Sequence, residues 1–324
     1  MAPVRHTRHR RDGGFIIVAV LWIMLALATL ASIYAAYVVR TAYAVGPSDD
    51  RVNAEALFTA ALELTAYRLT AAQTQNAATA APGVQPGAQA AQKPTRPSNG
   101  RFNFRLGRAT IVGEFHSESG RVDLNTAPKP LLASLFAMFG ARPDDADQYA
   151  DRIIAWRSPA PQNGQPDAEG DAYRVAGRNY APRGGPFQEV GELWLVLGLP
   201  PGWVERVMPY ITVYSGVPQV NIFDASPFVL ASLPGVSRQQ VNAVLAARDL
   251  PDVDGRALLA LLGDAQGNAT AEPGNAVRVT VTIQFDGGMR TSADIVILLG
   301  DDANEPYRVL SWRDDFDQLA PAGG

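Results

Sequence analysis

Residues 15–39 read FIIVAVLWIMLALATLASIYAAYVV and contain no charged side chain. As an α-helix this stretch would be about 37 Å long, enough to cross a hydrocarbon core of about 30 Å with some tilt. Residues 1–14, which precede it, carry four arginines and one aspartate, a net charge of +3. Because cytoplasmic flanks of membrane helices are enriched in basic residues, we predict a single-pass protein with the bulk of the chain across the membrane.

The basic leader ends in Gly13-Gly14, and the apolar run starts directly at Phe15. A cleaved secretory signal could use Ala42-Tyr43-Ala44 as its cleavage site. The apolar region of such signals is only about 7–15 residues long, however, and residues 15–39 are well beyond that length. A plain signal anchor is a second alternative. A basic leader that ends in glycine before phenylalanine and an apolar helix resembles the class III signal of type IV pilins and pseudopilins. This resemblance implies that a prepilin peptidase cuts after Gly14 and methylates the new amine of Phe15.

The fifth residue counted from Phe15 is Ala19, where most pilins and pseudopilins have glutamate. A carboxylate inside the bilayer is costly unless it is paired. In these families its partner is taken to be the N-terminal amine of the subunit already in the filament, and a subunit that starts the filament has no such predecessor. An apolar residue at this position is typical of the type II secretion system protein K family (general secretion pathway protein K), whose members are minor pseudopilins. The resemblance therefore implies an assembly role for Ala19.

The chain has 324 residues, of which 47% are apolar, and this composition is typical of globular proteins. The chain has no cysteine, which excludes disulfides, thiolate zinc sites, iron–sulfur clusters and a cysteine nucleophile. The net charge is −4, and without the leader it is −7, which argues against broad nucleic-acid binding.

Beyond residue 39 the sequence predicts three kinds of segment: a continuing helix, a flexible linker and β-strands. Residues 40–69 continue the helix outside the membrane, with Gly46-Pro47 interrupting the pattern, and residues 70–100 are an Ala/Gln/Pro-rich flexible linker. Residues 101–126 and 275–318 alternate apolar and polar side chains, which predicts strands. Among these, Gly107-Arg108 separates two alternating runs and predicts a hairpin.

An internal repeat lies between the strand regions. VDLNTAPKPLLASL at 122–135 aligns with VNIFDASPFVLASL at 220–233, and each copy passes from a short extended piece into a helix. Ser237 and Gln240 predict a capping box for a later helix. We therefore expect an α+β fold: a long N-terminal transmembrane helix and a β-domain interrupted by inserted helical subdomains at 127–217 and 218–274.

Four further segments occur in the order found in protein K: GRVDLNTAP at 120–128, PFQEVGEL at 186–193, VNI at 220–222 with ASLPG at 231–235, and RVLSWR at 308–313. The resemblance implies a pilin-like body with a helix-hairpin-helix-like part in its insert. It also implies an inner-membrane protein with its bulk in the periplasm, at the tip of the pseudopilus that exports folded proteins across the outer membrane. The implied partners are the minor pseudopilins I and J, the major pseudopilin, the prepilin peptidase and the inner-membrane secretion platform.

Catalytic chemistry finds little support in the sequence. His6 and His9 lie in the leader, and His116, at the end of a predicted strand, is interpreted as a surface residue. Lys93 and Lys129 lie in no P-loop, and no Gly-x-Gly-x-x-Gly opens a helix. We therefore predict a protein that is not an enzyme.

One acidic segment is a candidate metal site. Asp167, Glu169 and Asp171 alternate in a Gly/Pro-rich stretch that predicts a loop, and calcium prefers about six to eight oxygen ligands. The EF-hand spacing is absent, whereas the family resemblance implies calcium in such a region. The alternative is a solvated acidic loop.

Two other functions stay open from the sequence. Residues 233–236 (LPGV) before an amphipathic helix resemble a helix-hairpin-helix, as in a membrane-anchored DNA-uptake receptor, but Ser237 stands where the DNA-binding form has a second glycine. Nearby basic residues are Arg238 and Arg248. A generic membrane-anchored periplasmic interaction protein is the other alternative.

Overall fold

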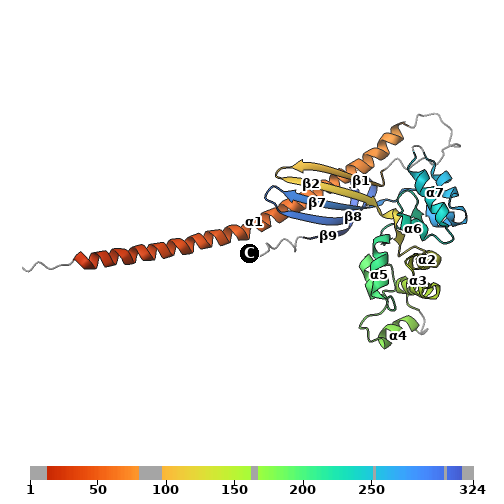
Figure 1. Ribbon diagram of the computed structural model, residues 1–324, viewed down its shortest axis with the longest axis horizontal. Helices are drawn as coiled ribbons and strands as arrows, with labels where there is room; N and C mark the ends of the chain where they lie inside the picture. Colours follow the sequence, from red (N-terminus) through yellow and green to blue (C-terminus); the bar gives the residue numbers. More distant parts are fainter. Residues whose placement is uncertain (1–12, 80–96, 162–166, 251–252, 303–304, 316–324) are drawn as a thin grey trace, which may run out of the picture. The chain divides into compact units, whose positions relative to one another are not determined.

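The computed structural model describes residues 13–79, 97–161, 167–250, 253–302 and 305–315 (Figure 1). It divides into two compact units, Met1–Ala56 and Leu57–Gly324. A single helix, α1 (Gly13–Thr79), begins in the first unit and ends in the second.

Helix α1 differs from the sequence prediction in two places. It is continuous through Gly46-Pro47, where an interruption was expected. A proline inside a helix removes one backbone hydrogen bond and crowds the preceding turn, at a cost of about 3 kcal/mol, although its fixed φ is itself helical. The helix also continues past residue 69 to Thr79, because residues 70–79 (TAAQTQNAAT) are rich in alanine, the strongest helix former. Residues 80–96 of the predicted linker lie outside the described residues.

The strand regions from the two ends of the predicted β-domain form one antiparallel sheet in the order β1-β2-β7-β8-β9. The strands are β1 (Asn99–Leu106), β2 (Ala109–Ser117), β7 (Ala276–Phe285), β8 (Arg290–Asp302) and β9 (Glu305–Asp314). The hairpin between β1 and β2 is confirmed: Leu106 pairs with Ala109, and Gly107 has a φ of +59°, which favours glycine.

Residues of α1 from Leu57 onward pack against the sheet. Phe58 and Leu62 are buried, and the ring of Phe58 meets that of Trp312 in β9 edge to face at 6.1 Å. The hydroxyl of Tyr307, also in β9, donates to Glu63 Oε1 at 3.1 Å. Burial and this hydrogen bond raise the pKa of Tyr307 to about 12. The last strand therefore fixes the helix to the sheet, and the terminal RVLSWR segment has a structural role.

Residues 122–270, here called the insert, lie between β2 and β7 in the chain and form a mainly helical body at the end of the sheet where β2 ends and β7 begins (Figure 1). Short 3₁₀ turns are labelled η. The chain enters through η1 (Glu118–Gly120). The first helical group is β3 (Val122–Asp123), α2 (Lys129–Met138), α3 (Pro143–Arg157), α4 (Ala168–Val175), η2 (Val190–Leu195), α5 (Pro201–Val207), η3 (Met208–Tyr210) and β4 (Ile211–Thr212). The second is β5 (Val220–Asn221), α6 (Pro227–Ala231), α7 (Arg238–Arg248), α8 (Gly255–Ala260), η4 (Gly263–Asn268) and β6 (Ala269–Thr270). The expected α+β fold with a helical insertion is confirmed.

The internal repeat is visible in the backbone. Strand β3 pairs in parallel with β4, and β5 pairs in parallel with β6, so each group is closed by a two-residue strand pair. At the start of each copy a side-chain oxygen caps the turn. Asp123 Oδ1 accepts from the Asn125 N–H at 2.7 Å, and Asn221 Oδ1 accepts from the Phe223 N–H at 2.8 Å. Equivalent residues therefore perform equivalent roles in both copies.

The equivalence extends to the helices that follow. Arg157 ends α3 and donates to the carbonyl of Ala127 at 2.8 Å, while Arg248 ends α7 and donates to the carbonyl of Ala225 at 2.7 Å. The turns into α3 and α7 contain Gly140 and Gly235, with φ of +98° and +78°. The capping box of Ser237 and Gln240 is confirmed. The helix-hairpin-helix resemblance of the second copy stays a prediction.

Candidate functional site: the junction of sheet and insert

The predicted membrane and processing segment lies on α1. Residues Val18–Tyr37 are long and apolar enough to cross a membrane, with a mean hydropathy of 2.2. Gly14 and Phe15 lie in the first turn of α1, but their side chains, like residues 1–12, are outside what the structure describes. Ala19 is half-buried within the helix. Cleavage after Gly14 and methylation of Phe15 stay predictions.

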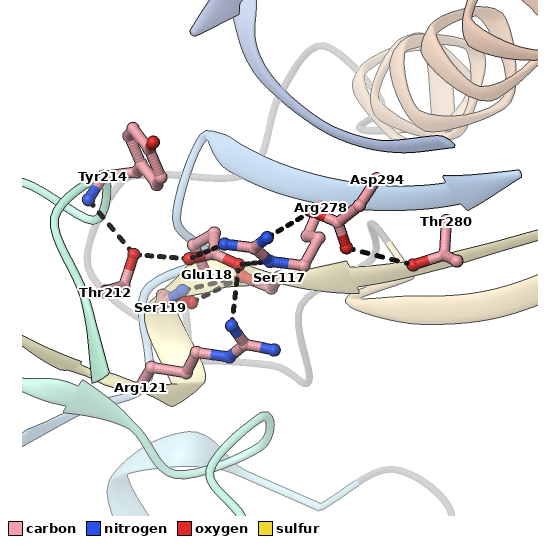
Figure 2. A network of polar contacts seen from close by, with 9 residues as sticks. All are labelled: Ser117, Glu118, Ser119, Arg121, Thr212, Tyr214, Arg278, Thr280 and Asp294. Carbon is pink, nitrogen blue, oxygen red and sulfur yellow. Dashed lines mark hydrogen bonds and ion pairs between the residues drawn. The ribbon is translucent and has the colours of Figure 1, made fainter. Parts of the chain in front are cut away.

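A buried carboxylate marks the place where the chain leaves the sheet for the insert (Figure 2). Glu118 in η1 is fully buried, and its Oε1 accepts from Arg278 Nε of β7 at 2.7 Å. Its Oε2 accepts a hydrogen bond from the hydroxyl of Thr212 in β4. Arg121 lies 3.5 Å from Oε1. One side chain thus binds both the sheet and the insert.

The charges around Glu118 balance one another. Arg278 also pairs with Asp294 of β8 (Figure 2). Burial alone would lower the pKa of Arg278, but the hydrogen bonds and negative charges of Glu118 and Asp294 outweigh burial and raise that pKa above its usual value. Burial lowers the pKa of Arg121 against the opposing charge of Glu118. A buried charge persists only when it is paired and hydrogen-bonded, and this network meets that condition.

A second polar chain lies beside the first. Ser117 and Ser119 hydroxyl oxygens are 2.7 Å apart, and Ser119 Oγ donates to Asp224 Oδ2 at 2.9 Å. Asp224 belongs to the second helical group. The junction therefore contacts both groups of the insert.

The family motifs at 120–128 and 186–193 meet inside the insert. The Asn125 amide donates to the Phe187 carbonyl at 2.9 Å, and its Oδ1 accepts from the Phe187 N–H at 2.7 Å. Buried Glu192 accepts from Arg183 at 2.6 and 2.7 Å and from Trp156 Nε1 at 3.2 Å. Burial alone would raise the pKa of Glu192, but these hydrogen bonds bring it below its usual value. The residues of these motifs therefore stabilise the interior of the insert through hydrogen bonds to one another and to neighbouring segments.

The sequence did not predict the roles of Glu118 and Glu192. A weak signal was present, because Glu118 lies two residues before, and Glu192 within, a segment that was singled out for its family resemblance. Their partners could not be found from spacing, since Arg278 is 160 residues from Glu118.

The acidic segment is helical rather than the expected loop. Asp167 is the N-cap of α4 and accepts from the Gly170 N–H at 2.9 Å. Glu169 pairs with Arg152 at 2.9 Å, and Asp171 pairs with Arg174. Acidic residues are favoured at a cap and in the first turn, which explains the helix. Residues two apart on a helix point to different sides. As placed, the three carboxylates do not converge, and the described residues contain no cluster of three or more His, Cys, Asp or Glu suited to a metal.

Calcium binding at Asp167, Glu169 and Asp171 stays a prediction, and it requires these carboxylates to exchange their present partners for the ion. Calcium at millimolar concentration should then raise the melting temperature of the purified full chain by mass action. The double variant Asp167→Asn/Asp171→Asn should lose that increase, whereas Asp264→Asn in η4, outside the segment, should keep it. If millimolar calcium leaves the melting temperature of the wild-type chain unchanged, the predicted calcium site would be contradicted.

The surface position expected for His116 is confirmed, and the structure also places Lys129. His116 is exposed at the end of β2, and Lys129 at the start of α2 pairs with Asp147 and Asp151 at 3.3 and 2.9 Å. Neither residue lies in the junction.

Two comparisons with known proteins give matches. Residues 100–216 match the sequence model of one family, described as Type II secretion system (T2SS), protein K. The fold is similar to that of a chain in the crystal structure of the GspK-GspI-GspJ complex from the enterotoxigenic Escherichia coli type 2 secretion system, with a TM-score of 0.51 and 15% sequence identity. The similarity covers 82% of this chain and 99% of that chain. A comparison with curated protein sequences found no match.

Proposed function

We propose that this chain is a minor pseudopilin that helps to initiate the pseudopilus. Its residues 100–216 match the type II secretion system protein K family. One observation carries the proposal: the residues that match the family supply nearly all of the first hairpin of the sheet and the whole first helical group of the insert. The family match therefore covers the combination of strands and inserted helices that distinguishes this fold.

The membrane helix gives this function its location. Val18–Tyr37 supports a membrane-anchored protein. We assign the anchor to the inner membrane in a single pass, with the basic leader in the cytoplasm and the sheet and insert in the periplasm, because the arginines precede the apolar run.

The partners follow from the shared fold. The solved relative belongs to a complex of GspK with GspI and GspJ. By that likeness, the direct partners proposed for this chain are the minor pseudopilins I and J. The other proposed partners, which act at earlier or later steps of assembly, are the prepilin peptidase, the inner-membrane platform and the major pseudopilin. The role is structural rather than enzymatic, in keeping with a polar junction whose groups bind one another.

A place at the tip follows from the size of the insert. Residues 122–270 form a body with its own core beside the sheet, and a subunit stacked directly above would have to avoid it. Ala19 agrees with this place, because a first subunit has no neighbour whose amine would pair with a carboxylate.

The Ala19→Glu variant should not improve secretion. The added carboxylate is disfavoured by about 2.5–3.5 kcal/mol at a helix centre in the bilayer, and in a tip subunit no amine offsets it. The measurement is secretion of an exported protein in cells that carry the variant. Ala26→Glu, deeper in the same helix, is the matched control and should be at least as harmful. Increased secretion by the Ala19→Glu protein would contradict the tip assignment.

Crosslinking tests the place in the filament directly, because the chain contains no cysteine and each introduced one is unique. Cysteines at Leu21 and Leu25 on the membrane helix should crosslink to a few minor pseudopilins. Cysteines at Arg142 and Glu205, which are exposed on the insert, should remain free of the major pseudopilin. Crosslinks from the insert to many copies of the major pseudopilin would show a subunit inside the shaft.

A further inference from the structure

The sheet and the insert have separate hydrophobic cores. The core cluster of the insert runs from Val122 to Ala269 through both helical groups. Buried sheet residues such as Val279 and Ile295 do not belong to it. Both cores lie in the one compact unit Leu57–Gly324, but parts of a chain that share no large apolar core keep more freedom to move relative to one another. The orientation of the insert therefore depends on what the junction supplies.

The backbone at the junction is closely packed. A Cβ added at Gly120 would lie 2.5 Å from the carbonyl oxygen of Asp224, and one added at Gly274 would lie 2.6 Å from the Cβ of Ser119. Gly120 is where the chain enters the insert and Gly274 is where it returns. The two segments that connect the sheet and the insert thus lie side by side, and any rotation of the insert on the sheet has to occur about this crossing.

Glu118 is placed to prevent this turning. It is held on the sheet side by Arg278, and its other oxygen accepts from Thr212 of the insert. Thr212 is itself fixed, because its hydroxyl accepts from the Tyr214 N–H at 3.1 Å and its carbonyl accepts from the Leu124 N–H at 2.8 Å. The bond between Glu118 and Thr212 therefore joins two rigid surroundings.

Besides the hydrogen bond from Ser119 to Asp224, another connection lies further out. Arg313 of β9 reaches Glu189 of the insert at 3.2 Å, with both side chains about half exposed. Exposed ion pairs contribute little, because solvent screens them and their side chains lose entropy. The buried contact at Glu118 is the stronger constraint on orientation.

We propose that the Glu118 carboxylate is the lock that holds the insert in one orientation on the sheet, and that the crossing at Gly120 and Gly274 becomes a hinge when this lock is removed. Glu118 is a positioning residue: it acts through Arg278 and Thr212 rather than by contacting a partner. The inference rests on the proposed function only for its consequence, since a tip subunit with a fixed insert presents the same faces to each partner.

Distances between spin labels test the proposal on the purified full chain in detergent. One pair of cysteines, at Asn103 of β1 and Glu205 of α5, reports the orientation of the insert on the sheet. A second pair, at Glu205 and Gln239, lies within the insert. All three positions are exposed and outside the junction. Wild type should give one narrow distance distribution for each pair.

The variants separate orientation from folding. Glu118→Gln and Thr212→Val should broaden or shift the distribution between Asn103 and Glu205 and leave the pair within the insert unchanged. Thr212→Val keeps the shape of the side chain, so it decides the matter if Glu118→Gln fails to fold. Glu192→Gln is the matched control: it neutralises another buried, arginine-paired carboxylate, but one enclosed within the insert, and should leave the orientation unchanged.

Two results would overturn the lock. One is a wild-type distribution between Asn103 and Glu205 that is already broad, and the other is a distribution unchanged in Thr212→Val. Either leaves the pseudopilin assignment standing, because that assignment depends on crosslinks in the assembled filament.

Discussion

Leu132→Ala should lower the free energy of unfolding by about 2–5 kcal/mol, and Leu230→Ala should do the same. Both leucines are fully buried, at matching positions of the repeat in α2 and α6. Each substitution removes apolar surface from the core and leaves a cavity that the surrounding helices fill only in part. Similar losses are expected because the two positions have equivalent surroundings.

Urea unfolding of the full chain, followed by tryptophan fluorescence, measures this effect. Trp156, Trp194 and Trp203 report from the insert. Since one core cluster spans both helical groups, either variant should shift a single shared transition. Val175→Ala, at a side chain 89% exposed, is the control and should change stability by no more than about 0.5 kcal/mol. If both leucine variants unfold at the same urea concentration as wild type, the burial of the two repeat positions would be contradicted.

Gly14→Val should leave the leader attached to the protein. If a prepilin peptidase cuts after Gly14, the mature chain starts at Phe15 with a methylated amine. Glycine allows close approach to the backbone at the scissile bond, whereas valine adds a branched side chain there. The uncut variant retains the +3 leader on the cytoplasmic side and should fail to enter the pseudopilus.

Mass spectrometry of the N-terminus in wild-type and variant cells measures this processing. Ala2→Val, at the far end of the leader, is the control and should still be cut. An uncut wild-type chain would favour a plain signal anchor. A mature chain that starts at Val45 would show cleavage after Ala44 by a signal peptidase.

The local patterns in the sequence were reliable where the interactions are local. The hairpin at Gly107-Arg108 and the capping box of Ser237 and Gln240 involve neighbours in the chain, so their residue types were sufficient to predict them. The end of α1 and the helix at Ala168–Val175 were predicted wrongly, because helix propensity and capping outweighed a composition typical of linkers and loops.

By itself, the sequence determined that residues 15–39 form an apolar helix of membrane-spanning length, that a β-domain is interrupted by helices, and that the insert contains a repeat. These follow from unbroken hydrophobicity, alternation and self-similarity, which are properties of neighbouring residues. Only the tertiary structure decided which acidic residues are buried and hydrogen-bonded inside the protein. Glu118 meets Thr212 across 94 residues and Arg278 across 160, and Glu192 meets Trp156 across 36. A buried carboxylate is stabilised by whichever donors the fold brings within hydrogen-bonding distance, and that proximity is a property of the folded chain.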